Sequence, residues 1–134
     1  MSGKVLIVED DPISQKMVRD ALRAAGYETD EVDSGELALQ KVAAGTPDLI
    51  VMDIRLPGMD GLETTRRLKA DPGTAAIPIV AVTAHVMPED ESLIRDAGCD
   101  AYMPKPLRFS ALLGVVRNLL AGRPPELDEQ PSAG

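Results

Sequence analysis

The most constraining feature of the sequence is a series of short, uninterrupted apolar runs that alternate with stretches of helical periodicity. The run at 5–8 (Val-Leu-Ile-Val) is continuous, which is typical of a strand buried on both faces. In the stretch after it, apolar residues from Ile13 to Ala25 recur at the spacing of one helical face. This pair of patterns recurs along the chain. It predicts strands at about 5–8, 27–32, 48–52, 77–82 and 101–103, and helices at about 12–25, 34–44, 62–70, 88–97 and 109–120.

Five strand–helix units of this kind predict an α/β fold, with a five-stranded parallel sheet and helices on both faces. Right-handed crossovers leave few strand orders, and we expect the flavodoxin-like order 2-1-3-4-5. A length of 134 residues suits one domain. We expect the folded domain to span residues 1–121, and the polar, proline-rich residues 122–134 to form a disordered tail.

The charge balance excludes several classes of partner. The chain has 14 basic and 22 acidic residues and a net charge of −8, so we expect no direct binding to the negative backbone of nucleic acid. No apolar run approaches the ~20 residues of a membrane span, and we expect no membrane association. The single cysteine, Cys99, cannot form an internal disulfide, which fits a reducing compartment. These features together predict a cytoplasmic protein.

Polar side chains follow four of the predicted strands. Glu9 and Asp10 follow the first strand, Asp53 the third and Thr83 the fourth, and Lys105 lies just beyond the fifth. The carboxyl ends of parallel strands share one edge of the sheet, and ligands bind there at the point where the strand order reverses. In the predicted order that point lies between the first and third strands. We therefore expect these five side chains to converge.

Carboxylates that converge in this way need a compensating charge. Two of them ~4 Å apart repel by about 4 kcal/mol at an effective dielectric constant of 20, so they must take up a proton or bind a cation. Oxygen ligands on a partly hydrated site suit Mg²⁺. The Lys105 ammonium and the Thr83 hydroxyl would complete a receptor for a phosphoryl group. We infer that Asp53 is the nucleophile and becomes an aspartyl phosphate.

Four segments resemble the signature blocks of bacterial two-component response-regulator receiver domains, of the stand-alone type. These segments are residues 5–10, 48–61, 79–84 and 102–106, and the likeness extends over residues 4–121. The resemblance implies a phosphorelay switch. It also implies that the protein catalyses only its own phosphorylation and slow dephosphorylation, so we do not expect an enzyme acting on other substrates. The donor would be a phosphohistidine on a sensor histidine kinase or a histidine phosphotransfer protein. The output would be a downstream protein bound at the face of the fourth helix, fifth strand and fifth helix.

The resemblance assigns roles around the phosphoryl group. Asp53 matches the phosphoacceptor, and Glu9 and Asp10 match the acidic pair that serves Mg²⁺. The family also uses the backbone carbonyl at the position of Arg55 as a metal ligand, and the Arg55 side chain occupies a position that tunes hydrolysis.

The resemblance also assigns a switch. Thr83 matches the switch hydroxyl, Tyr102 the switch aromatic and Lys105 the phosphate-binding lysine, with a cis bond expected between Lys105 and Pro106. His85 occupies a second position that tunes hydrolysis in the family.

Ordinary structural roles are the alternative for some of these residues. Asp11 is interpreted as a helix cap because Pro12 follows it. Tyr102 could be a packing residue, and His85 an exposed loop residue.

Three rival functions stand beside the phosphorylation switch. A Mg²⁺-dependent phosphohydrolase similar to the haloacid-dehalogenase family needs a second aspartate at position 55, where this chain has Arg55. The second is a receiver that binds its partner without phosphorylation, and the third is a phosphate sink that drains a kinase.

Overall fold

The computed structural model describes residues 3–84 and 88–122, and within them strands and helices alternate from end to end. All ten predicted elements are present. The strands are β1 (Lys4–Val8), β2 (Glu28–Val32), β3 (Leu49–Asp53), β4 (Ile79–Thr83) and β5 (Ala101–Pro104). The helices are α1 (Pro12–Ala24), α2 (Gly35–Ala44), α3 (Gly61–Ala70), α4 (Pro88–Ala97) and α5 (Phe109–Leu120).

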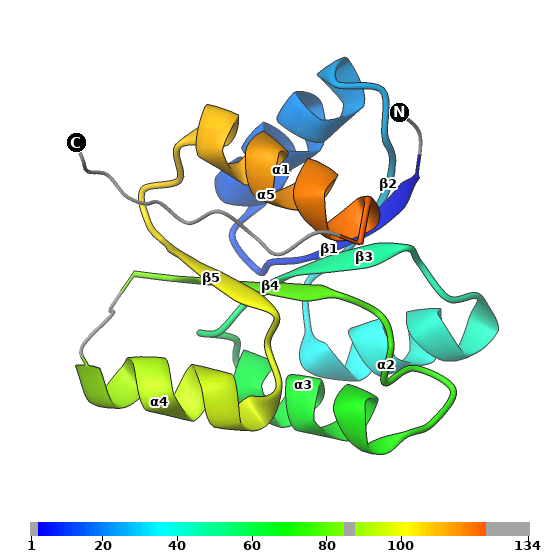
Figure 1. Ribbon diagram of the computed structural model, residues 1–134, viewed down its shortest axis with the longest axis vertical. Helices are drawn as coiled ribbons and strands as arrows, with labels where there is room; N and C mark the ends of the chain where they lie inside the picture. Colours follow the sequence, from blue (N-terminus) through cyan, green and yellow to red (C-terminus); the bar gives the residue numbers. More distant parts are fainter. Residues whose placement is uncertain (1–2, 85–87, 123–134) are drawn as a thin grey trace.

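The strands form one parallel sheet in the order β2-β1-β3-β4-β5, which confirms the predicted fold class and topology. Helices α1 and α5 cover one face of the sheet, and α2, α3 and α4 cover the other (Figure 1). The chain leaves β1 toward β2 on one side and returns to β3 on the other side. A ligand crevice is therefore expected beyond the carboxyl ends of β1 and β3.

Buried side chains form two clusters, one on each face of the sheet. Val5 and Ile7 belong to the cluster under α1 and α5, whereas Leu6 and Val8 belong to the cluster under α2 and α3. The apolar run in β1 is continuous because both of its faces are covered. Burial of each large aliphatic side chain contributes roughly 1.5–3 kcal/mol. The ends of the central strands are therefore held by packing on both sides.

Side-chain caps begin the first three helices. Asp11 accepts a hydrogen bond from the Ser14 N–H at 3.0 Å, which confirms its interpretation as a helix cap. Ser34 begins α2 and Asp60 begins α3 in the same way.

Helix α3 begins very close to the end of β3. The Gly61 N–H donates to the Ile54 carbonyl at 2.9 Å. A Cβ atom at position 61 would overlap the carbonyl oxygen of Asp53 and lie 2.8 Å from the Cα of Ile54. Only glycine fits there, so Gly61 allows the loop between β3 and α3 to close tightly beside Asp53.

Three strands begin later than predicted. Ile77 donates its N–H to the Thr74 carbonyl at 3.1 Å, so it belongs to a turn and β4 begins at Ile79. Tyr27 donates its N–H to the Leu22 carbonyl at 3.1 Å, so it belongs to the turn after α1 and not to β2. Asp48 precedes β3, and its carboxylate accepts the Lys4 N–H at 2.8 Å. Residues 1–2, 85–87 and 123–134 lie outside the described residues, and with them His85 and nearly all of the predicted tail. None of the described helices is long and apolar enough to cross a membrane.

Candidate functional site

Three carboxylates meet at the carboxyl edge of the sheet. Glu9 and Asp10 follow β1, and Asp53 is the last residue of the adjacent strand β3. One oxygen of each lies within 4.8 Å of one oxygen of the other two. Glu9 and Asp53 are buried, at 5% and 4% exposure, whereas Asp10 is exposed. The structure thus brings together the three acidic residues that the sequence singled out, with Asp10 on the solvent side.

Lys105 reaches this cluster from the loop between β5 and α5. Its Nζ lies 3.0 Å from Glu9 Oε1 and 3.5 Å from Asp53 Oδ2. The Lys105 N–H donates to the Thr83 carbonyl at 2.8 Å, and the Lys105–Pro106 bond is cis, as expected. Burial by itself would lower the pKa of Lys105, but hydrogen bonding to Glu9 and the charges of Asp53 and Glu9 outweigh burial and raise that pKa. The ammonium is therefore charged at neutral pH.

Asp53 is the most perturbed acid of the cluster. Burial, together with hydrogen bonding to Glu9 and repulsion by its charge, raises the pKa of Asp53 to about 7. The Lys105 charge and the hydrogen bond from the Arg55 N–H to Asp53 Oδ1, at 3.1 Å, oppose that increase. One ammonium is thus too little positive charge for the buried carboxylates, and a divalent cation would supply the rest.

Both carboxylate oxygens of Glu9 accept hydrogen bonds. Glu9 Oε1 accepts a hydrogen bond from Lys105, and Glu9 Oε2 accepts one from the Asp11 N–H at 3.2 Å. Asp10 stands at the open side of the cluster. An all-oxygen set with one exposed member matches what a partly hydrated Mg²⁺ prefers.

Gln15 is a residue that sequence reasoning missed. Its side-chain amide donates to the Glu9 carbonyl at 3.0 Å and to the Val32 carbonyl at 3.4 Å. These two bonds hold the loop that carries the acidic pair against the end of β2. The sequence contains no local signal for this role, because the three residues meet only when β1, β2 and α1 are packed together.

The two predicted switch residues lie at different depths. Thr83 is the last residue of β4 and is buried, one position beyond the partner of Asp53 in the β3–β4 register. Tyr102 in β5 is half-buried, and its hydroxyl donates to the carboxylate of Glu91 on α4. Tyr102 is therefore turned toward α4 in this structure.

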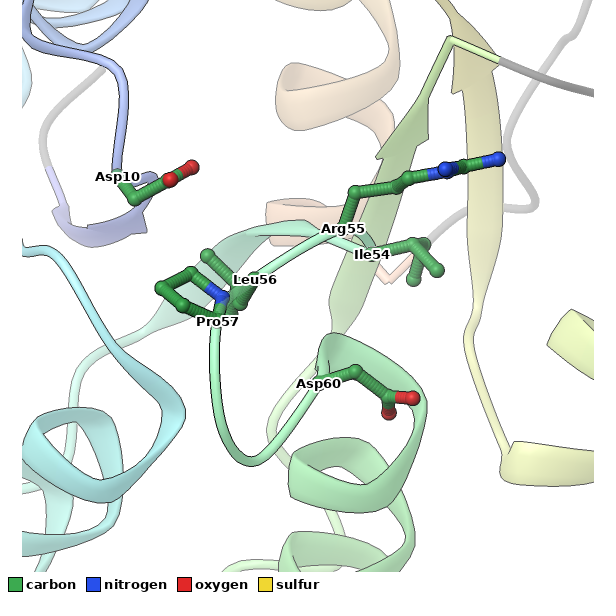
Figure 2. A pocket seen from close by; sticks show the side chains of 6 residues that line it. All are labelled: Asp10, Ile54, Arg55, Leu56, Pro57 and Asp60. Atoms are coloured by element: carbon green, nitrogen blue, oxygen red, sulfur yellow. The ribbon is translucent and has the colours of Figure 1, made fainter.

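An open pocket adjoins the acidic cluster along the loop between β3 and α3. Figure 2 shows Asp10 on one side of this loop and Asp60 on the other, with Leu56 and Pro57 between them. The Arg55 side chain extends away from Asp10 in this view, so Arg55 would serve a metal through its backbone only. Asp10 is the member of the acidic cluster that lines this pocket.

Comparison with known proteins identifies relatives along nearly the whole chain. A family model described as the response regulator receiver domain matches residues 5–117. The chain is 43% identical over 120 residues to the polar-differentiation response regulator DivK of Brucella ovis, and 42% identical to that of Brucella anthropi. Each match covers 90% of this chain and 98% of the relative.

Solved structures give the same result. A putative response regulator from Chloroflexus aurantiacus is 36% identical with a TM-score of 0.86, and the match covers 90% of this chain and 99% of that one. The receiver domain of a sensor histidine kinase from Pseudomonas aeruginosa, solved with a magnesium ion in its active-site cleft, is 30% identical with a TM-score of 0.84 and the same coverage. The family match and the fold together show that this chain belongs to the response regulator receiver domain family.

Proposed function

We propose that the protein accepts a phosphoryl group on Asp53 from a phosphohistidine, and that this changes its affinity for a partner protein. The observation that carries the proposal is the buried Asp53 carboxylate, which shares Lys105 with Glu9 and has a pKa raised to about 7. A group so perturbed at the ligand edge of an α/β sheet is a candidate for chemistry.

In the proposed reaction, a carboxylate oxygen of Asp53 attacks the phosphorus atom. The new bond is P–O, the bond that breaks is P–N to the donor imidazole, and the leaving nitrogen keeps the electron pair and takes up a proton. Lys105 and the Thr83 hydroxyl bind the phosphoryl oxygens in the product.

Asp10, Asp53 and the Arg55 carbonyl would hold a magnesium ion, with Glu9 as the fourth member of the set. When bound, Mg²⁺ supplies positive charge that keeps Asp53 ionised and compensates the phosphoryl oxygens. Glu9 already accepts bonds from Lys105 and the Asp11 N–H, so its contribution combines metal binding with fixing the Lys105 ammonium.

The proposed output surface is formed by α4, β5 and α5. Thr83 moves toward the new charge on Asp53, Tyr102 turns inward, and the shape of this surface changes. The donor is a sensor histidine kinase or a histidine phosphotransfer protein, and the partner at the output surface is a downstream protein in the cytoplasm. The proposed phosphoryl receptor and the proposed output surface lie on the same domain.

The test is phosphoryl uptake measured by intact mass. The protein is incubated with Mg²⁺ and acetyl phosphate, with parallel samples that contain EDTA or the Asp53→Asn variant. We expect a gain of one phosphoryl group in the complete sample only. An equal gain in Asp53→Asn would assign the group elsewhere, and no gain would favour a receiver that binds its partner without phosphorylation.

A second measurement separates a messenger from a phosphate sink. Capture of a partner on the immobilised protein is compared with and without beryllofluoride, which mimics the bound phosphoryl group. A partner captured only with the mimic supports the messenger, whereas phosphoryl uptake without any state-dependent partner supports the sink.

A further inference from the structure

A hydrogen bond between Tyr102 and Glu91 connects β5 to α4. The Tyr102 hydroxyl donates to Glu91 Oε2, while Oε1 of the same carboxylate lies 3.8 Å from Nη2 of Arg95, one turn further along α4. Glu91 thus binds a side chain of the sheet with one oxygen and a cation of its own helix with the other. An ionised acceptor makes the stronger class of hydrogen bond.

Strand alternation places Tyr102 and Thr83 on the same face of the sheet. Ala101 and Met103, the neighbours of Tyr102 in β5, belong to the core under α1 and α5, so Tyr102 faces the layer of α3 and α4. Strand β4 alternates in the same way, and Ala81 and Thr83 face this layer too. Two residues of the proposed switch therefore share one surface of the sheet.

Ala81 presents only a methyl group beside Tyr102. It is the partner of Tyr102 in the β4–β5 register, and its side chain ends at Cβ. Thr83 is the next residue of β4 on this face. A tyrosine ring that left Glu91 and turned inward would pass over Ala81 toward Thr83, and the hydrogen bond to Glu91 is a contact that it would lose.

The same bond also holds α4. This helix packs mainly against α3 and lies at the margin of the molecule below β5 (Figure 1). Among its described side chains, the buried ones are Ile94 and Ala97, which lie in its second half. Glu91 connects an earlier turn of the helix to the sheet. The position of Tyr102 and the position of this part of α4 are therefore coupled.

We propose that Glu91 is a positioning residue that holds Tyr102 away from Thr83 and α4 against β5. Glu91 thereby keeps the surface of α4, β5 and α5 in its unphosphorylated form. Loss of the acceptor at position 91 moves Tyr102 inward and shifts this surface toward the phosphorylated form without any phosphoryl group. The consequence for signalling rests on the proposed function, but the hydrogen bond exists without phosphorylation and can be tested by itself.

The test uses fluorine NMR of protein labelled with 3-fluorotyrosine. The chain has two tyrosines and no tryptophan, so Tyr27→Phe leaves Tyr102 as the single reporter. Glu91→Ala, Glu91→Gln and Asp96→Asn are compared in this background without Mg²⁺ or donor. Asp96 is an exposed carboxylate on the same helix and serves as the matched control.

In Glu91→Ala we expect the Tyr102 resonance to move by more than its line width. The hydrogen-bonded amides of α4, which begin after its first turn, should lose exchange protection. Loss of a charged acceptor corresponds to a roughly tenfold or greater rise in the fraction of molecules in which Tyr102 is turned inward. Glu91→Gln keeps an acceptor oxygen and should give a smaller displacement, and Asp96→Asn should give none. Acetyl phosphate with Mg²⁺ should move the parent resonance in the same direction as Glu91→Ala.

A Tyr102 resonance unchanged in Glu91→Ala would overturn the inference. So would an equal displacement in Asp96→Asn, because the effect would then be one of general helix charge. Absence of phosphoryl uptake by the parent would instead refute the proposed function, while the comparison without donor still decides the role of Glu91.

Discussion

Replacing the proposed nucleophile should make the folded protein more stable. Asp53→Asn removes a buried negative charge that lies beside Glu9, and it keeps a side chain of almost the same shape. The pKa of Asp53 is raised from 3.8 to about 7, a difference of about three pH units. At about 1.4 kcal/mol per unit, the ionised group lowers the free energy of unfolding by at most about 4 kcal/mol. Asparagine has no such penalty.

The stabilisation depends on pH with a definite sign. The folded pKa lies above the unfolded value, so between the two the folded protein binds more protons than the unfolded chain. The protonated form of Asp53 therefore keeps its full stabilising effect on the folded protein below about pH 4. That effect is lost as the pH rises to about 7, where Asp53 ionises in the folded protein. The advantage of Asp53→Asn should be about 2 kcal/mol at pH 5 and approach 4 kcal/mol at pH 8.

Urea unfolding followed by far-ultraviolet circular dichroism measures this difference at both pH values, in EDTA. Asp33→Asn is the matched control, because Asp33 is an exposed acid outside the cluster and should give no pH-dependent difference of this size. Saturating Mg²⁺ should stabilise the unsubstituted protein more than the variant, by about 3 kcal/mol at 100 times the dissociation constant. A variant no more stable at pH 8, or a difference that is the same at pH 5 and pH 8, would refute the reasoning.

Three further predictions concern the same edge of the sheet. Asp10→Asn should weaken Mg²⁺ binding at least about tenfold, measured by calorimetry, because it removes the solvent-facing carboxylate of the cluster; unchanged affinity would remove Asp10 from the metal set. Lys105→Met should raise the pKa of Asp53 above about 7, measured by carbon NMR of its carboxyl, because the Lys105 charge lowers that pKa; a lower pKa in the variant would contradict the assigned electrostatics. Gly61→Ala should destabilise the protein by about 3 kcal/mol in urea unfolding, because its Cβ would overlap the Asp53 carbonyl. Gly114→Ala is its control: nothing lies within 4 Å of a Cβ there, inside α5, so a gain of about 0.5–1 kcal/mol is expected.

Relations between distant elements could not be predicted from the sequence. Gln15 fixes the loop of the acidic pair by bonding to carbonyls of Glu9 and Val32, and nothing in its local sequence indicates this. The partner of Tyr102 was equally hidden, since Glu91 belongs to a different element and reaches Tyr102 only when α4 packs beside β5. A side chain's partner across an interface depends on the distance and angle between two elements, and local periodicity contains neither.

The sequence by itself determined the parallel sheet, its strand order and the edge at which the acids gather. Continuous apolar runs must be covered on both faces, and right-handed crossovers then leave few topologies, so these properties follow from short-range patterns. Only the tertiary structure decided how the charges at that edge share one ammonium. Burial and the neighbouring Glu9 raise the pKa of the Asp53 carboxyl, and the charge of Lys105, which bonds to Glu9 at 3.0 Å and approaches Asp53 at 3.5 Å, lowers it. Electrostatic interactions of buried groups vary with distances of about an ångström and with exposure to water, and packing of the whole domain fixes both.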